Sequence, residues 1–396
     1  MKSNPILKIL CVDIEGGHGG SSRSLFYTLK YLSKSNNKIK KNITVICKKN
    51  SWIKSEYHKL GIKCFIEPDM PKFTSLEKNS RNFYQIIKFI FVDWRKSRNF
   101  RKKILDMNKF DVIHFNHISL SILAFWLRQK RFKCSFFMHM RTMPYKNFFS
   151  KILLRLAAKV CNGFVYITEN EKKHVHELIG NPKVKEVIIY NPVEVSKKNL
   201  FRLKKKKILN IGILSSFSFK RGIDRVIEIL DAIPLKKRKD FLFSIAGDMK
   251  LEKNIPSIPN SFFYRGLTFK DFIEDKGYKK QFSFYGQLKN PEYFLERIDL
   301  LLKPTRENNP WGRDILESLG MGKPVISIGT YNRFVVNNIT GKLFREYDPF
   351  KIAEYLIYVS ENKSTLIKYR NFCRKKILDT CDPRNNALEM LKFWIS

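Results

Sequence analysis

The stretch from residue 304 to residue 327 constrains the fold more than any other part of the chain. An apolar run ends at Leu302, and a loop rich in turn-forming residues follows over Pro304–Pro310. Apolar residues then recur at helical spacing, and a short apolar segment comes after them at residues 324–327. The stretch therefore predicts a strand, a loop, a helix and a second strand in succession.

The start of the predicted helix has the features of a binding site for a sugar nucleotide. Gly312 lies in the first turn, where the lack of a side chain lets a phosphate approach the free backbone N–H groups. Glu317 follows about one and a half turns later, and its carboxylate can accept hydrogen bonds from hydroxyl groups. Amides for phosphate and a carboxylate for ribose together suit a sugar nucleotide.

Short apolar strands and helical patterns alternate along both halves of the chain. Such alternation predicts an α/β fold with doubly wound parallel sheets. A polar run at residues 196–207 predicts an exposed linker between an N-terminal domain, residues 1–195, and a C-terminal domain, residues 208–382. Residues 383–396 predict a C-terminal helix. The strand candidates are Ile6–Val12, Ile43–Cys47, Cys64–Ile66, Val112–Phe115, Cys134–His139, Phe164–Thr168, Ile208–Ile213, Phe241–Ala246, Phe262–Tyr264, Phe282–Tyr285, Leu300–Lys303 and Val325–Ile328.

The 304–327 stretch resembles the donor-site signature of the retaining GT-B glycosyltransferases of family 4. The matching residues are Pro304, Thr305, Gly312, Glu317, Ser318, Gly322, Pro324, Val325 and Ile326. The resemblance implies two doubly wound Rossmann-like domains that face a central cleft. The N-terminal domain would bind the acceptor, and the C-terminal domain would bind the nucleotide-sugar donor. The C-terminal helix would cross back to the N-terminal domain.

The resemblance also implies roles for individual residues of this stretch, with one departure from the family pattern. Glu317 takes the ribose-binding role. The family places another glutamate where this chain has Asn309, and Glu307 lies nearby, so either side chain can take the catalytic contact with the sugar hydroxyls. The neighbouring residues assigned to donor binding are Trp311, Gly312, Arg313 and Asp314.

A second segment of the C-terminal half resembles the family's pyrophosphate-binding region. The family has an arginine where this chain has Ile213, and Lys220 and Arg221 come just before a glycine. Either cation can hold the pyrophosphate and Arg313 can replace the missing charge, whereas a solvated charge pair is the alternative. Two further residues assigned to donor binding, each at a predicted strand end, are Gly247 and Gln287.

The N-terminal half has a glycine-rich loop between its first predicted strand and helix. Residues 16–22 read GGHGGSS, so the backbone can approach a ligand and the helix start offers N–H donors to phosphate. The loop does not match the dinucleotide-binding fingerprint, because Ser22 stands where the last glycine is required. The resemblance assigns Gly19 and Gly20 to the donor phosphate, and Ser21 and Ser22 to the acceptor.

Three polar residues follow predicted strands of the same half. His139 ends an apolar strand, where a histidine is either a structural hydrogen-bonding residue or, as the resemblance implies, a catalytic contact to the donor sugar. Arg141 is a candidate for binding a substrate phosphate. His117 comes after another strand and is a candidate for the acceptor side.

The net charge of +40, from 76 basic and 36 acidic residues, limits the partners of the chain. Such a field attracts nucleic acid, anionic lipid or phosphorylated substrates, unless it reflects only solvated lysine faces. Between residues 72 and 109, aromatic and aliphatic residues lie among basic ones. This pattern favours either a helix on an anionic membrane surface or a core helix with a basic tail. No apolar stretch reaches the roughly 18 residues of a membrane span, and seven scattered cysteines favour a reduced, cytoplasmic chain.

We therefore expect a retaining glycosyltransferase that moves a sugar from a UDP- or GDP-sugar to a hydroxyl of a glycan or lipid-linked acceptor. The resemblance implies no metal and no cofactor besides the nucleotide-sugar co-substrate. The positive net charge favours a peripheral enzyme at the inner face of the cytoplasmic membrane that takes part in bacterial lipopolysaccharide, O-antigen or capsule assembly. The alternatives are a GT-B-fold sugar-nucleotide epimerase and a non-catalytic nucleic-acid-binding protein, and the sequence has no recognised nucleic-acid-binding motif.

Overall fold

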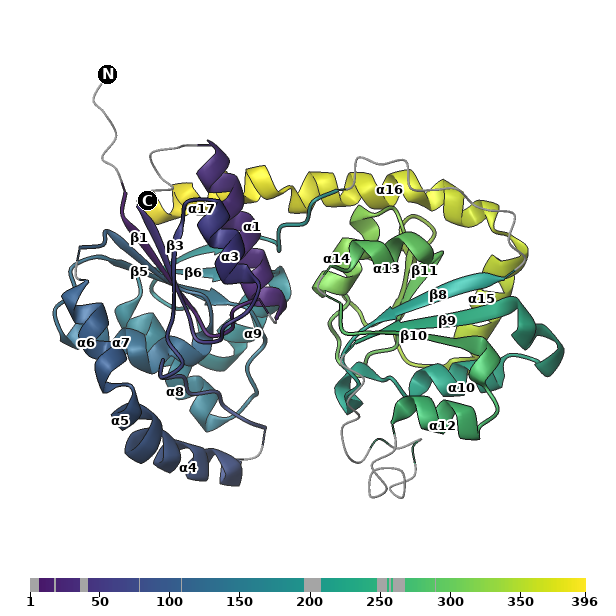
Figure 1. Ribbon diagram of the computed structural model, residues 1–396, viewed down its shortest axis with the longest axis horizontal. Coiled ribbons are helices and arrows are strands. Elements are labelled where there is room, and N and C mark those ends of the chain that lie inside the picture. Colours follow the sequence, from purple (N-terminus) through teal and green to yellow (C-terminus); the bar gives the residue numbers. More distant parts are fainter. Residues whose placement is uncertain are drawn as a thin grey trace. The chain divides into compact units, whose positions relative to one another are not determined.

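A computed structural model divides the chain into two compact units, shown in Figure 1. The first unit contains Met1–Pro192 and Pro383–Ser396, and the second contains Val193–Asp382. The predicted linker at residues 196–207 lies outside the described residues. The structure describes residues 7–17, 19–35, 42–77, 79–107, 109–195, 208–247, 255, 258, 268–288 and 290–396.

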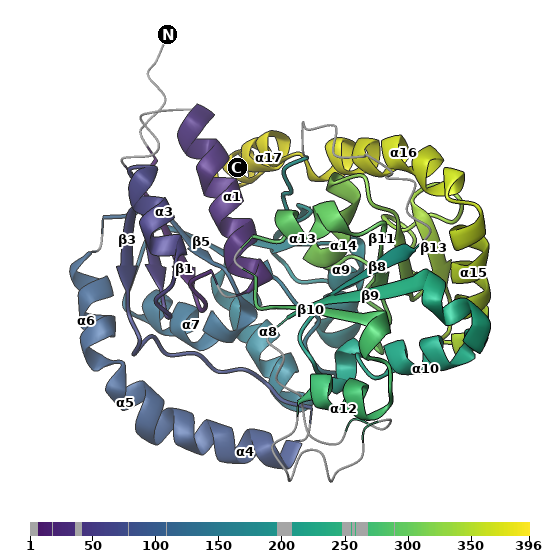
Figure 2. The same cartoon turned by 45° about the vertical axis from the view of Figure 1, so that its right-hand side comes forward.

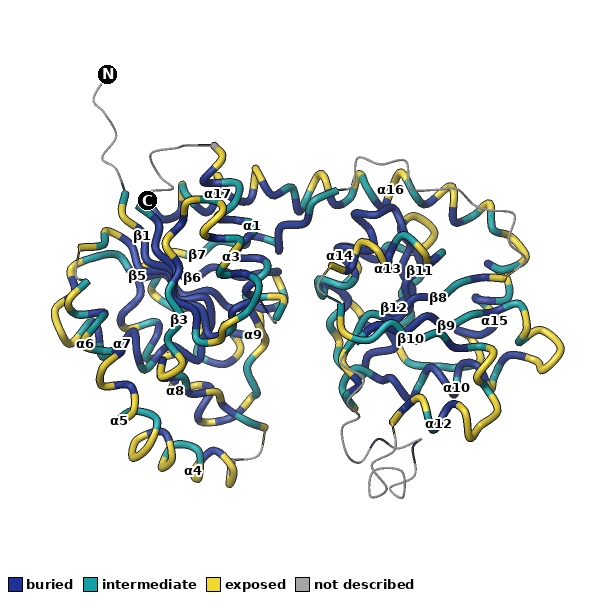
Figure 3. Tube along the Cα trace, viewed as in Figure 1, coloured by how far each residue is buried: buried dark blue, intermediate teal, exposed yellow. Residues whose placement is uncertain are grey.

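A seven-stranded parallel sheet forms the centre of the first unit. Its strand order is β3-β2-β1-β4-β5-β6-β7, so the chain starts in the middle of the sheet and winds outward in both directions. Helices on the two faces bury separate apolar cores, and Figure 3 colours the central strands between them as buried. The strands are β1 (Ile9–Asp13), β2 (Ile43–Cys47), β3 (Lys63–Ile66), β4 (Val112–Phe115), β5 (Ser135–Met140), β6 (Gly163–Tyr166) and β7 (Lys185–Ile188).

The helices of this unit begin where the sequence supplies capping side chains. Asn147 accepts a hydrogen bond from Ser150 N at 2.9 Å and Thr168 accepts one from Asn170 N at 3.1 Å, so each satisfies a free N–H of the first turn. The helices are α1 (Gly20–Ser35), α3 (Ile53–Lys59), α4 (Asn79–Lys88), η1 (Phe89–Asp93), α5 (Trp94–Lys96), α6 (Arg98–Asp106), η2 (Ile118–Leu120), α7 (Ser121–Gln129), α8 (Phe148–Val160), α9 (Glu169–Ile179) and α17 (Pro383–Ile395).

The second unit is also a parallel α/β layer, with strand order β10-β9-β8-β11-β12-β13. In Figure 1, α10, α12 and α15 cover one face of this sheet and α13, α14 and α16 cover the other. The strands are β8 (Leu209–Leu214), β9 (Phe241–Ala246), β10 (Phe282–Gly286), β11 (Leu300–Lys303), β12 (Val325–Ile328) and β13 (Gly341–Phe344). The helices are η3 (Phe219–Arg221), α10 (Arg225–Ala232), η4 (Leu235–Asp240), α12 (Phe269–Asp275), η5 (Lys279–Gln281), α13 (Glu292–Arg297), α14 (Arg313–Gly320), α15 (Pro349–Glu361) and α16 (Ser364–Cys381).

The helix α17 lies against the first unit although it follows the whole second unit in sequence. Figures 1 and 2 show it beside α1, and its Phe393 ring lies 5.2 Å from that of Phe137 in β5. Asn386 donates to the Tyr190 carbonyl at 2.8 Å. A Cβ on Gly163 would lie 2.6 Å from the Phe393 ring, so the sheet presents a glycine where this aromatic side chain packs.

Two parallel α/β sheets of seven and six strands with helices on both faces confirm the predicted fold class. The expected strand Phe262–Tyr264 falls outside the described residues. Among the described helices, none has both the length and the apolar character that a membrane span requires.

Candidate active site

A buried lysine ends strand β11 directly before the loop that leads into α14. The Lys303 side chain is 4% exposed, and its ammonium lies 3.1 Å from Oδ1 of Asp314 in the first turn of the helix. Burial lowers the pKa of Lys303, and the Asp314 carboxylate acts in the opposite direction. Gly312 is the N-cap residue between them, and a Cβ there would lie 2.5 Å from the lysine Nζ. The helix N-terminus and this ammonium thus place positive charge beside a side-chain-free backbone.

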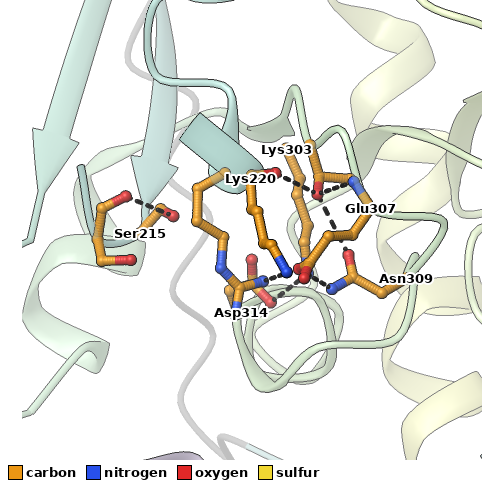
Figure 4. Close-up of polar contacts among 9 residues, drawn as sticks. Ser215, Lys220, Lys303, Glu307, Asn309 and Asp314 are labelled. Atoms are coloured by element: carbon orange, nitrogen blue, oxygen red, sulfur yellow. Dashed lines mark hydrogen bonds and ion pairs between the residues drawn. The ribbon is translucent and has the colours of Figure 1, made fainter. Parts of the chain in front are cut away.

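The two side chains that compete for the sugar-hydroxyl role are hydrogen-bonded to each other, as Figure 4 shows. The Asn309 amide donates to Oε2 of Glu307 at 2.8 Å. Arg221 lies 3.5 Å from the same carboxylate oxygen. The buried Thr305 hydroxyl accepts from the Glu307 backbone N–H at 3.0 Å and fixes the turn. The loop therefore brings both predicted residues and one predicted cation into one polar cluster.

A left-handed glycine holds the η3 turn against this loop. Gly222 has φ +68°, and a Cβ there would overlap the Pro304 carbonyl, so the position needs glycine. The Lys220 carbonyl accepts from Arg306 N at 2.9 Å and from the Thr305 hydroxyl at 3.2 Å. These bonds hold the turn that contains both predicted cations, Lys220 and Arg221, next to the 304–312 loop.

A bidentate ion pair locks the same two segments together. The Arg306 guanidinium donates to both oxygens of the fully buried Asp224, at 2.8 and 2.6 Å. It also lies over the Phe219 ring, with 4.4 Å between its carbon and the ring centroid. Charge-assisted bidentate bonds of this kind are strong and directional, so the positions of the loop and the η3 turn are fixed relative to each other.

The predicted ribose ligand and the predicted substitute cation form a buried pair in helix α14. Nη2 of Arg313 lies 2.8 Å from Oε1 of Glu317, and each side chain is 8% exposed. The Arg313 charge is therefore balanced by its neighbour one turn on. Trp311, also assigned to the donor, is 4% exposed and packs edge-on against Tyr331, with ring centroids 5.1 Å apart.

The two strand-end residues assigned to the nucleotide lie in different environments. Gly247 follows β9, its N–H donates to the Gly286 carbonyl at 2.9 Å, and a Cβ there would overlap the Ser215 carbonyl. This close approach of two backbones explains the glycine. Gln287 directly follows β10 and is exposed.

The glycine-rich loop of the first unit is hydrogen-bonded to the Asp13 carboxylate, which the sequence did not single out. Ser22 is fully buried, and its hydroxyl donates to Asp13 at the end of β1 and accepts from Gly16 N at 3.2 Å. Gly20 opens helix α1, and Gly20 is exposed while Ser21 is partly exposed. Gly19 precedes the helix in the loop and is partly exposed. The loop thus has a rigid buried side and an open backbone side.

Arg141 continues this buried polar network across the carboxyl ends of the strands. Its guanidinium donates to Asn116 and to Asn191, both at 2.9 Å, and Asn116 donates to Asp13 at 2.9 Å. Burial raises the pKa of the Asp13 carboxyl, while its bonds from Ser22 and Asn116 oppose this shift. Asp13, Asn116 and Asn191 were missed because asparagines and a lone aspartate after strands carry no distinctive spacing.

Both predicted histidines are buried and neutral. His139 is 1% exposed in β5, and burial lowers its pKa well below the ordinary value, assisted by the nearby Arg141 charge. His117 caps η2 by accepting from Ser119 N at 3.1 Å. Burial lowers the pKa of His117 to about 4, with the Lys72 and Arg141 charges as smaller causes. Neither ring can therefore carry a charge to a substrate at neutral pH.

Two α/β units with this loop-and-helix site define a GT-B protein, and comparisons with known proteins give its family. The family model Glycosyltransferase Family 4 matches residues 18–197, and the model Glycosyl transferases group 1 matches residues 193–377. The chain belongs to these GT-B glycosyltransferases of the family 4 type.

Similar proteins agree with this assignment. An uncharacterized 42.6 kDa protein in the cps region of Klebsiella pneumoniae is 24% identical over 289 residues, or 67% of this chain and 70% of that protein. The crystal structure of Anabaena Alr3699/HepE in complex with UDP covers 98% of this chain and 99% of its own, with a TM-score of 0.72 and 16% identity. A sucrose-phosphate synthase from Thermosynechococcus elongatus covers 98% of both chains, with a TM-score of 0.70 and 12% identity. These likenesses show the GT-B fold.

Proposed function

We propose that the protein transfers a sugar from a nucleotide diphosphate sugar to an acceptor hydroxyl with retention of the anomeric configuration. The observation that carries this proposal is the Gly312 backbone, which has no side chain and lies beside the buried Lys303 ammonium at the start of α14. A diphosphate there would meet helix N–H groups and a desolvated cation. Solved structures with the same fold contain UDP or UDP-glucose, which supports a UDP-sugar as the donor and leaves a GDP-sugar to be tested.

The proposed chemistry is stabilisation of the leaving diphosphate. The bond from the sugar carbon to the phosphate breaks while the acceptor oxygen attacks from the same face, and the departing phosphate oxygen takes the acceptor proton. The negative charge that develops on the phosphate would be met by Lys303, Lys220 and Arg221 together with backbone amides. Asn309 and Glu307 would hold sugar hydroxyls, and Glu317 the ribose. The proposal includes no metal or other cofactor.

The acceptor that we propose is a glycan or lipid-linked glycan of a bacterial surface polysaccharide. The relative encoded in a cps region supports a role in capsule, O-antigen or lipopolysaccharide assembly. An anionic membrane surface is the proposed partner, which would place the enzyme at the inner face of the cytoplasmic membrane. An aromatic and basic stretch of the first unit supports this partner.

That stretch is the helix formed by α4 and η1, which Figure 3 shows along an exposed edge of the first unit. Tyr84 is 71% exposed and Phe91 is 57% exposed, whereas Phe89 is buried in the apolar core, so the segment packs one face on the first unit and exposes the other. A cavity of about 650 Å³ lies beside it and is lined in part by Lys72, Arg81 and Lys88. Within the described residues no ion pair of these three cations is found, although Asp93 also lines the cavity, and cations of this kind suit lipid phosphates.

A thermal-shift panel tests the proposed donor site. Purified protein would be heated with UDP, GDP, ADP, CMP and their common sugar conjugates, and a ligand at about 100 times its Kd adds about 2.7 kcal/mol to the free energy of unfolding. Lys303→Met should abolish the shift. Lys323→Met is the matched control, because Lys323 is also a buried lysine of this unit but lies beyond the other end of α14. A flat panel, or an equal loss in both variants, would contradict the proposed site.

Product analysis then distinguishes transfer from epimerisation. The proposed enzyme consumes the donor only when an acceptor with a free hydroxyl is added, and the new glycosidic bond keeps the donor's anomeric configuration. Conversion of the donor to its epimer without acceptor would favour the epimerase alternative.

A further inference from the structure

One buried nitrogen in the first unit has no hydrogen-bond partner among the described residues. This atom is Nε2 of His139, which is shielded from solvent in the structure. A buried polar group without a partner destabilises a fold, so each one requires an explanation. The position of the ring gives one, because His139 lies near the carboxyl end of β5, beside the polar network of Asp13, Asn116 and Arg141.

The same ring is connected through its other nitrogen to helix α17. Strand β4 places His114 opposite Phe137, so His114 and His139 share one face of the sheet. Nε2 of His114 and Nδ1 of His139 are 3.3 Å apart. The indole Nε1 of Trp394 lies 3.3 Å from Nδ1 of His114. The three side chains form an unbranched chain of hydrogen bonds.

The direction of this chain follows from the chemistry of the indole group. A tryptophan N–H can only donate, so Nδ1 of His114 must be the acceptor. Burial lowers the pKa of His114 to about 3, so its ring is neutral and carries its one proton on Nε2. That proton points to Nδ1 of His139, which must accept it. His139 is neutral as well, so its own proton lies on the unpartnered Nε2.

We propose that Trp394 and His114 are positioning residues that hold His139 in the tautomer with its proton on Nε2, so that this N–H is a fixed donor to an oxygen of the bound substrate. A ring free to exchange tautomers would present this donor for only part of the time. The assignment of the tautomer is independent of the proposed function. The hydrogen bond from this N–H to a substrate oxygen, in contrast, rests on the proposed function.

Nuclear magnetic resonance tests the tautomer directly. Histidine-selective ¹⁵N labelling distinguishes a protonated ring nitrogen from an unprotonated one by chemical shift, and His139→Gln removes the signals of His139 and so identifies them. The wild-type protein should show a protonated Nε2 and an unprotonated Nδ1 on His139. In Trp394→Phe, which keeps the aromatic ring but lacks the N–H, the two His139 nitrogens should move toward averaged shifts. A protonated Nδ1 in the wild type would overturn the proposal.

Turnover tests the use of the donor. Glutamine places an amide N–H near the position of Nε2, whereas asparagine places it near Nδ1, so His139→Gln should retain more activity than His139→Asn. Trp394→Phe should lower kcat about five- to tenfold, the effect of one hydrogen bond, with the Kd for UDP unchanged. Phe393→Leu is the packing control, since that neighbour on α17 contacts Phe137 without a hydrogen bond. Equal losses in Trp394→Phe and Phe393→Leu, or equal activity of the two His139 variants, would contradict the role.

The two tests fail separately. If the tautomer is as stated but no variant affects turnover, His139 does not contact the substrate. If the protein has no transferase activity at all, the labelled spectra still decide the tautomer.

Discussion

The ammonium of Lys303 and the carboxylate of Asp314 lie 3.1 Å apart, although one ends a strand and the other begins the following helix. The lysine is 4% exposed and the aspartate 17% exposed. If one partner were removed, water could therefore solvate the remaining Asp314 carboxylate better than the remaining Lys303 ammonium.

This difference predicts unequal effects of removing either partner. Asp314→Ala leaves a desolvated ammonium without its partner and should cost about 3–5 kcal/mol. Lys303→Met removes the buried charge itself and leaves a carboxylate that water reaches, so it should cost about 1–2 kcal/mol. Urea unfolding of both variants measures the two values. A larger loss in Lys303→Met would show that the aspartate is the less solvated partner.

Gly312→Ala should separate nucleotide binding from folding. The backbone at Gly312 has φ −61°, which alanine adopts readily, but its methyl would press on the Lys303 ammonium at 2.5 Å. We expect a loss of stability of about 1–2 kcal/mol and a fall in UDP affinity of at least about tenfold. Gly320→Ala at the other end of α14 is the control, and calorimetric titration gives both affinities. Unchanged UDP binding in Gly312→Ala would place the phosphates elsewhere.

Substitution of Glu317 needs a variant that spares Arg313. Glu317→Ala leaves the buried guanidinium without its partner and should cost about 3–5 kcal/mol, so weak donor binding by that variant could reflect unfolding. Glu317→Gln keeps an acceptor for Arg313 and should fold, while UDP affinity falls about tenfold. Glu228→Gln is a matched control, because that carboxylate accepts from Tyr347 at 2.6 Å in the same unit. Similar UDP affinity in the wild type, Glu317→Gln and Glu228→Gln would show that Glu317 does not bind the ribose.

Acid should destabilise the first unit before carboxylates are protonated. The pKa of His114 is about 3 in the folded chain and 6.5 ordinarily, so below pH 6.5 only the unfolded chain binds this proton. The His114 contribution to the free energy of unfolding is thus constant above about pH 7 and falls as the pH decreases from about 6.5 toward 3. At pH 5 His114 alone should cost about 2 kcal/mol. Urea unfolding at pH 7.5 and pH 5 should show a smaller difference in His114→Asn than in the wild type or in the exposed-site variant His58→Asn.

Membrane binding should depend on the exposed face of α4 and η1. Ile87 and Phe91 are 56% and 57% exposed, and replacing both by serine should weaken binding to vesicles with anionic lipid by about tenfold or more. The control replaces Phe350 and Ile367, which are 68% and 50% exposed in the second unit. Cosedimentation at low and moderate salt measures both. Equal binding of the two double variants, or none by the wild type, would refute the membrane role.

The fold was predictable because parallel sheets need apolar strands, and such strands are visible as short apolar runs. The strands that escaped prediction, β7 and β13, are at sheet edges and only partly buried. Gly341–Phe344 lacks an apolar run, whereas β7 contains the start of the run Val187–Tyr190, which was a usable signal. In the site, Gly312 and Glu317 stood out through their spacing. Lys303 did not, although a lysine between an apolar strand and Pro304 is a usable signal.

Long-range pairing explains what the sequence could not show. Trp394 and His114 are 280 positions apart, and only the return of α17 to the first sheet brings them together. The Arg313–Glu317 pair is close in sequence, yet its burial depends on packing that spacing does not reveal. Partners of this kind follow from tertiary structure.

The return of α17 also bears on how the protein is made. Residues 193–382 form one continuous unit and can complete their core as soon as they leave the ribosome. The first unit cannot, because α17, which shares one face of the sheet with α1 and α3, is translated only after all of the second unit. During that interval Phe137 lacks the Phe393 ring of α17 that packs against it. Nascent chains stalled before residue 383 should therefore recruit chaperones to the unit that emerged first.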